Sequence, residues 1–122
     1  MNERTKQILF WTPRVLGILF AAFISIFALD VFGAGYSFWE TILALLMHLI
    51  PTGIVLLILA LSWRWELIGG ILFPVLGILY LIAFEGQHWS AYLLIAGPLF
   101  LIGALFLLDW FYRDELHPKP GV

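Results

Sequence analysis

Four long apolar stretches dominate the 122-residue sequence. A helix rises 1.5 Å per residue, so the hydrocarbon core of a bilayer requires about 20 apolar residues, with a range of roughly 17 to 25. Such stretches are expected to cross as helices, because lipid offers the backbone no hydrogen-bond partner. The four are residues 15–32, 41–61, 67–84 and 91–108. The sequence therefore predicts an all-α, membrane-embedded, antiparallel four-helix bundle.

The composition argues against a water-facing surface. Hydrophobic residues make up 63% of the chain and charged residues only 11%, whereas a soluble domain carries about 25% charged residues. The net charge of −2 gives no reason to expect a nucleic-acid partner. There are no cysteines, which excludes disulfides, thiolate metal sites and thiol redox chemistry. We expect one transmembrane domain over residues 1–122, of which 114–122 form a short flexible tail.

Tryptophan and basic residues indicate where the spans end and how they are oriented. Indole rings favour the headgroup level, and all six tryptophans flank a predicted span. The six basic residues fall before the first span, in the second connector and after the fourth span: Arg4, Lys6, Arg14, Arg64, Arg113 and Lys119. With four spans these regions share one side, which the positive-inside rule makes the cytoplasm. We therefore expect a multi-pass plasma-membrane protein with both termini cytoplasmic. A cleaved signal peptide is disfavoured, since the first run is long and no small-x-small site follows it.

A short sequence word recurs in two spans. Gly17-Ile18-Leu19-Phe20 reappears as residues 70–73 at the same depth of the third span. This suggests two tandem hairpins in the same orientation, related by an axis along the membrane normal. Apolar helices also share words by chance, so both interpretations stay open.

Small residues and prolines occur within the predicted spans. Gly70, Pro74 and Gly77 lie on one face of the third span, and Gly103 lies on the fourth. Small residues let membrane helices approach closely, so we expect packing within the bundle; the alternative is a homo-oligomer interface. Prolines also occur mid-span in the second, third and fourth spans. A cavity of kinked helices is possible there, but neighbouring helices ordinarily repair the lost bonds.

His48 is the one ionisable residue well inside a predicted span. Ionisable groups at that depth are candidates for function by default. Thr41, His48 and Thr52 share one face of the second span, and Pro51 frees the carbonyl of Met47 beside the imidazole. A neutral imidazole satisfied by a carbonyl or a threonine is the favoured interpretation. A proton relay or ligand role is the alternative.

Acidic residues gather at the predicted outer side. Ser37 and Glu40 have the spacing of a capping box, which we prefer to a binding role for Glu40. Asp30 ends the first span on the same side, and with Glu85 and His88 it could form an acidic mouth above His48 that binds a cation. A solvated rim is the simpler interpretation. At the inner side, Arg64 with Glu66 and Asp109 with Arg113 are expected to be interfacial anchors.

Several runs resemble a family of small, uncharacterised prokaryotic membrane proteins. The runs are ALDVF at 28–32, FWET at 38–41, MHLIP at 47–51, WRWE at 63–66 and LDW at 108–110. The resemblance covers most of the chain from Arg14 to Trp110. It implies a membrane location and four spans, and it assigns no site. The small multidrug exporters differ, because their first helix carries a membrane-embedded glutamate, whereas the first predicted span of this chain has no charge before Asp30.

The sequence favours a non-enzymatic membrane protein that acts by packing or partner binding. The expected partners are the lipid bilayer and either a second copy or another membrane protein. No catalytic, cofactor or metal-binding residue is predicted. The alternative function is a small transporter or channel that uses His48 and Thr52, with Asp30 and Glu40 at an outward-facing mouth.

Overall fold

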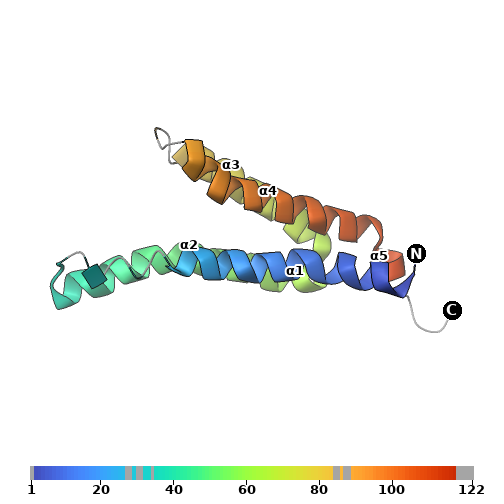
Figure 1. Ribbon diagram of the computed structural model, residues 1–122, viewed down its shortest axis with the longest axis horizontal. Helices are drawn as coiled ribbons and strands as arrows, with labels where there is room; N and C mark the ends of the chain where they lie inside the picture. Colours follow the sequence, from blue (N-terminus) through green and yellow to red (C-terminus); the bar gives the residue numbers. More distant parts are fainter. Residues whose placement is uncertain are drawn as a thin grey trace.

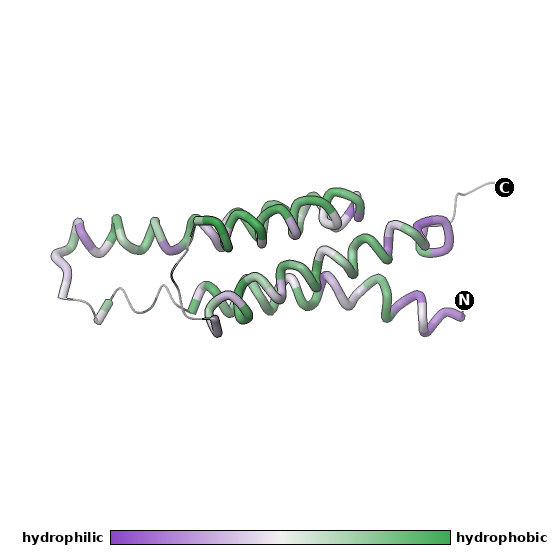
Figure 2. The backbone as a smooth tube through the Cα atoms, turned by 90° about the horizontal axis from the view of Figure 1, so that it is seen from above, coloured by the Kyte–Doolittle hydropathy of each residue, from purple (hydrophilic) through white to green (hydrophobic). Residues whose placement is uncertain are grey.

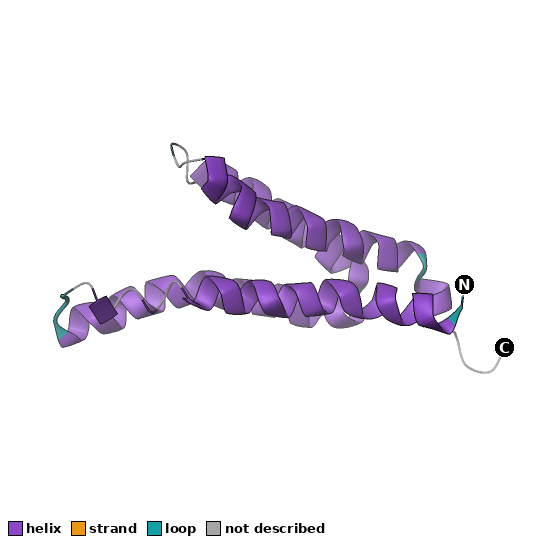
Figure 3. Ribbon diagram, in the orientation of Figure 1, coloured by secondary structure: helices purple, strands orange, loops and turns teal. Residues whose placement is uncertain are grey.

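The computed structural model describes residues 2–26, 29, 32–33, 35–83, 86 and 89–117. These residues form four long helices and one short one, and none of them lies in a strand. The helices are α1 (Glu3–Ile26), α2 (Phe38–Arg64), α3 (Glu66–Ala83), α4 (Trp89–Phe111) and α5 (Arg113–Leu116). Each long helix is long and apolar enough to cross a membrane. The predicted all-α four-helix fold is confirmed, and Figure 3 shows its helical content.

The first helix begins earlier than the hydropathy of the chain suggests. It starts at Glu3, whereas the predicted first span starts at Val15. The Asn2 side-chain oxygen accepts a hydrogen bond from the Thr5 backbone N–H at 2.8 Å, which caps the start of the helix. The consequence is that Arg14 lies inside α1 and not in a flanking segment.

The four long helices form a ring. α1 packs against α2, α2 against α3 and α3 against α4, and α1 also packs against α4. The two hairpins, α1–α2 and α3–α4, lie together at the end of the molecule that carries both termini, and they diverge toward the other end (Figure 1). Hydrophilic residues gather at the end with the termini, around the start of α1 and in α5 (Figure 2). The molecule is thus closed at one end and open at the other.

The buried core fills the closed part of the ring. The Phe73 and Phe106 rings stack across α3 and α4 with centroids 5.9 Å apart and an angle of 1° between planes. Around them pack buried side chains from α1, α2 and α4: Phe20, Ala21, Val55, Ile58, Leu59, Leu99 and Ile102. No buried residue of α2 precedes Thr52, and none of α3 follows Gly77. Burial therefore ends where the hairpins separate.

Glycines allow the closest helix contacts. A Cβ placed on Gly103 would lie 2.4 Å from Cδ of Pro74, and one on Gly70 would lie 2.5 Å from Cδ2 of Leu107. The predicted role of these small residues in packing within the bundle is confirmed. In the other hairpin, a Cβ on Gly17 would lie 2.8 Å from Cδ1 of Leu59. Both copies of the repeated word thus place a glycine against a leucine of the following helix, while the duplication itself stays a prediction.

Candidate functional site

A buried arginine joins three helices at the closed end of the bundle. Arg14 of α1 has no exposed surface. Its Nη1 donates to Oδ2 of Asp109 in α4 at 3.1 Å, and its Nη2 donates to Oε1 of Glu66 in α3 at 3.3 Å. Both carboxylates are buried as well. One guanidinium therefore bridges two carboxylates from different helices, a geometry that suits its planar set of donors.

The rest of the guanidinium is enclosed by backbone and aromatic groups. Arg14 also donates to the carbonyl of Phe10 at 2.5 Å and to the carbonyl of Trp63 at 2.6 Å. The Cζ atom of Arg14 lies 3.7 Å from the centroid of the Phe10 ring and within 5.5 Å of the centroids of the Trp63 and Phe106 rings. A cation over an aromatic face is stabilised by the ring quadrupole. Arg14 thus contacts all four long helices.

His117 attaches the end of the described chain to this cluster. Its Nε2 lies 2.5 Å from Oε1 of Glu66, the same oxygen that Arg14 contacts. The Glu66 side chain is 5% exposed, whereas that of His117 is 46% exposed. The His117 backbone N–H donates to the Arg113 carbonyl at 2.7 Å, and its ring meets the Phe10 ring edge-on. We define the charged cluster as Arg14, Glu66, Asp109 and His117.

The charged cluster is balanced neither in charge nor in hydrogen bonding. One guanidinium faces two carboxylates, so the three buried groups carry an excess of negative charge when both carboxylates are ionised. Two buried atoms, Nε of Arg14 and Oδ1 of Asp109, have no hydrogen-bond partner. Only His117 reaches solvent. The arrangement can bind helices together, since its three buried groups come from three different helices.

The charged cluster corrects two sequence predictions. Glu66 was expected to anchor beside Arg64, and Asp109 to pair with Arg113. Instead both bind Arg14, because their positions on α3 and α4 turn them into the bundle. Arg64 is exposed, and Arg113 donates to the Trp110 carbonyl at 2.9 Å while lying over its ring. The missed signal was that Arg14, Glu66 and Asp109 all border the ends of their predicted spans on the same side of the bundle, at one depth.

His48 and Thr52, the predicted polar residues of α2, have different surroundings. His48 is exposed, and its Nδ1 lies 2.9 Å from the carbonyl of Ala44, one turn earlier in its own helix. Thr52 is buried and accepts a hydrogen bond from the Ser25 hydroxyl of α1 at 3.3 Å. The imidazole is thus bonded to a carbonyl, as the structural interpretation expected, but to that of Ala44 and not of Met47.

Only some residues of the predicted outer acidic group lie in the part of the chain that the structure describes. Ser37 is the N-cap of α2, and its hydroxyl accepts a hydrogen bond from the Glu40 backbone N–H at 3.4 Å. The predicted capping role of Ser37 is confirmed, and the Glu40 side chain is exposed. Asp30, Glu85 and His88 lie outside the described residues. The acidic mouth therefore stays a prediction.

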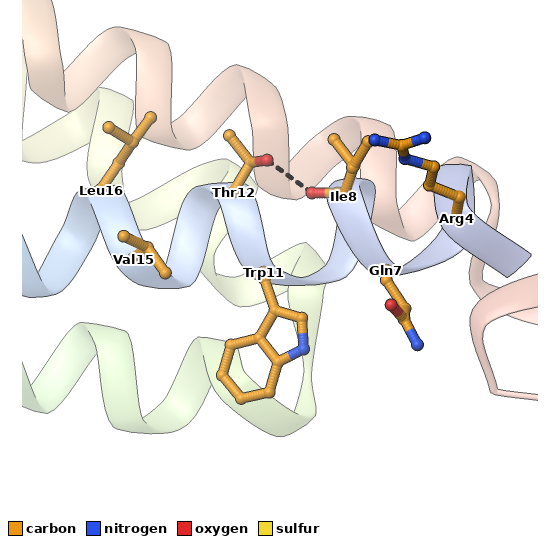
Figure 4. Close-up of a pocket in the computed structure, with 7 residues that line it drawn as sticks. All are labelled: Arg4, Gln7, Ile8, Trp11, Thr12, Val15 and Leu16. Carbon is orange, nitrogen blue, oxygen red and sulfur yellow. Dashed lines mark hydrogen bonds between the residues drawn. The ribbon is translucent and has the colours of Figure 1, made fainter.

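A shallow groove runs along the exposed face of the first half of α1. Figure 4 shows its lining, in which Arg4 and Gln7 lie at one end and Val15 and Leu16 at the other. The Thr12 hydroxyl donates to the Ile8 carbonyl at 2.5 Å, so this polar group is used within the helix. The groove brings together no pair of groups that could perform acid–base or nucleophilic chemistry.

The fold and the charged cluster define a multi-pass membrane protein whose helices are joined by buried ion pairs. Residues 1–117 match the family described as Domain of unknown function (DUF7670), and the chain belongs to it. The resemblance to an uncharacterised family is confirmed by this match. Neither a curated protein nor a solved structure matches the chain.

Proposed function

We propose that this chain is a non-enzymatic plasma-membrane protein, with both termini in the cytoplasm, that acts by binding a partner helix within the bilayer. The observation that carries the proposal is the division of the bundle into a closed and an open end. At the closed end the ionised groups are engaged with one another, and Arg14 and Asp109 are fully buried. At the open end α2 is half-buried at Thr41 and Ala44 and exposed at His48.

One stripe of α2 at this end differs from an ordinary lipid-facing surface. Thr41, Ala44, His48 and Thr52 follow one another at intervals of three or four residues, and the same stripe continues to the buried Val55. The stripe is therefore the core-facing side of α2, which is buried at Thr52 and only partly covered toward the open end. Its residues are small or polar, the types that bring membrane helices together. His48 adds a ring nitrogen that a partner side chain can bond.

A second candidate function follows from the same position of His48. Ionisable residues inside membrane spans often mark the ion or substrate pathways of transporters and channels. His48 lies on the core-facing stripe of α2 at the open end, toward the predicted outer surface, and this position favours a transporter or channel. The closed end then corresponds to a shut cytoplasmic side. Partner binding remains the leading proposal, because the described residues offer no polar path from His48 through the Phe73 and Phe106 core.

Site-specific crosslinking tests the partner-binding proposal. A photoreactive amino acid at Ala44 would lie on the core-facing stripe of α2. As the control, the same amino acid at Leu46 would lie on the opposite, exposed face of α2 at nearly the same depth. We expect irradiation of native membranes to give a protein adduct from position 44 and only lipid adducts from position 46. Equal adducts at both positions would contradict the proposal.

Flux measurements separate the two functions. Wild type and His48→Gln would be reconstituted in vesicles, and proton and cation flux would be recorded. Glutamine retains hydrogen bonding but does not titrate near neutral pH. We expect no flux from either protein. Flux in wild type that disappears in a folded His48→Gln protein would instead establish the transporter.

A further inference from the structure

His117 is the one member of the charged cluster that reaches solvent, and it lies at the junction of α5 and the bundle. Its Nε2 contacts Glu66 Oε1 at 2.5 Å, and Arg14 approaches that same oxygen at 3.3 Å. The Phe10 ring of α1 packs against the imidazole. A cytoplasmic proton could therefore reach the cluster through His117 without any opening of the bundle.

Charged groups from several elements surround the His117 imidazole. The groups that face it are Glu66 from α3, Asp109 from α4 and Arg14 from α1. Its own segment adds Arg113, Asp114 and Glu115, and the start of α1, near α5, adds Glu3 and Lys6. Within the buried part, two carboxylates outnumber one guanidinium. A proton on His117 supplies the missing positive charge.

We propose that His117 and Glu66 form a proton-binding site that fastens α5 to the bundle. Histidine is the side chain that ordinarily changes charge between pH 5 and 8. A neutral imidazole can still donate a hydrogen bond to Glu66, but a charge-assisted bond is roughly twice as strong. Gain of a proton therefore holds α5 against α1 and α3, and loss of the proton releases it. The site goes beyond the proposed function, because it uses neither His48 nor the open end.

Spin-label distances test the site directly. The chain has no cysteines, so a pair at Gln7→Cys and Glu115→Cys labels only α1 and α5. Both residues are exposed and line one surface pocket between these helices. In nanodiscs we expect one short distance at pH 6 and the loss of most of this short-distance population at pH 8. A pair at Val75→Cys and Leu101→Cys, on exposed faces of α3 and α4, should not change and serves as the control for the fold.

Two variants make the result specific to the proton on His117. His117→Lys keeps a cation throughout this pH range, so we expect the short distance at both pH values. His117→Gln keeps a donor without a charge, so we expect the loose state at both. A wild-type distance that is unchanged between pH 6 and pH 8 would overturn the proposal. A pH response that persists in His117→Gln would overturn it as well.

Discussion

Arg14 and Asp109 lie 95 positions apart in the sequence, and their side chains meet at 3.1 Å with neither exposed. The contact joins the first helix to the last. With Glu66 it gives the closed end of the bundle a charged junction inside a largely apolar core. The stability of the fold should therefore depend on charge balance at this point.

Removal of the guanidinium should be strongly destabilising. Arg14→Leu leaves Glu66 and Asp109 buried without a cation. Removal of one partner of a buried ion pair lowers the free energy of unfolding by about 3–5 kcal/mol. Unfolding in detergent followed by circular dichroism would measure the loss. Arg64→Leu is the matched control, because Arg64 is exposed and should change stability little.

Replacement of the whole network should be far milder. A triple variant with Arg14→Leu, Glu66→Leu and Asp109→Leu removes every buried charge at once, and apolar replacement of a buried ion network is often neutral or stabilising. We expect the triple variant to unfold at a higher temperature than Arg14→Leu alone. A triple variant less stable than the single one would show that the three residues do not act as one unit.

Gly103→Ala should loosen the α3–α4 hairpin. Its new Cβ would lie 2.4 Å from the rigid Pro74 ring, so the helices must shift, at a cost of about 1–3 kcal/mol. Gly97→Ala on the same helix is the control, since its Cβ would lie 3.8 Å from Leu93 and make an ordinary contact. Alanine favours helix over glycine by about 1 kcal/mol, so the control should match or exceed wild-type stability. Equal stability losses for both variants would contradict the assigned packing.

Ser37→Ala should weaken the start of α2. The hydroxyl of Ser37 accepts the Glu40 backbone N–H, and loss of an N-cap side chain costs about 1 kcal/mol. Thermal unfolding in detergent would detect the change, and Ser37→Asp, which retains an acceptor, should preserve the wild-type midpoint. An unchanged midpoint in the alanine variant would count against the cap.

Single cysteines should report the orientation of the chain. The six basic residues predict that Gly35 and Gly86 face outward and that Asn2 and Glu115 face the cytoplasm. An impermeant thiol reagent applied to intact cells should label Gly35→Cys and Gly86→Cys only. Labelling at position 2 or 115 would show that the chain has the opposite orientation.

The fold was predictable because each span carries its own signal. Hydropathy over about 20 residues is a local property, so the four helices could be found without knowledge of their neighbours. The N-cap at Ser37 was equally local, since its donor is three residues away. The use of Gly70 and Gly103 in packing followed from residue size alone.

The charged cluster was not predictable in the same way. Arg14 looked like a flanking cation, because hydropathy locates the apolar core of a helix and not its first turns. Its partners were hidden as well, since Glu66 and Asp109 each had a nearer basic residue in sequence. A pairing between distant helices depends on the rotation of each helix, which short-range spacing does not fix. His48 illustrates the same point, because its exposure depends on where the two hairpins separate.

The position of Arg14 also sets the order in which this chain can mature. Arg14 belongs to α1 and is synthesised before Asp109, which belongs to α4. Until that helix is made, Arg14 has the carbonyls of Phe10 and Trp63 and the Glu66 carboxylate as partners, but not Asp109. The first helix therefore reaches its final set of contacts only after the last long helix has been inserted. A chain interrupted before Asp109 would lack the ion pair that joins these two helices.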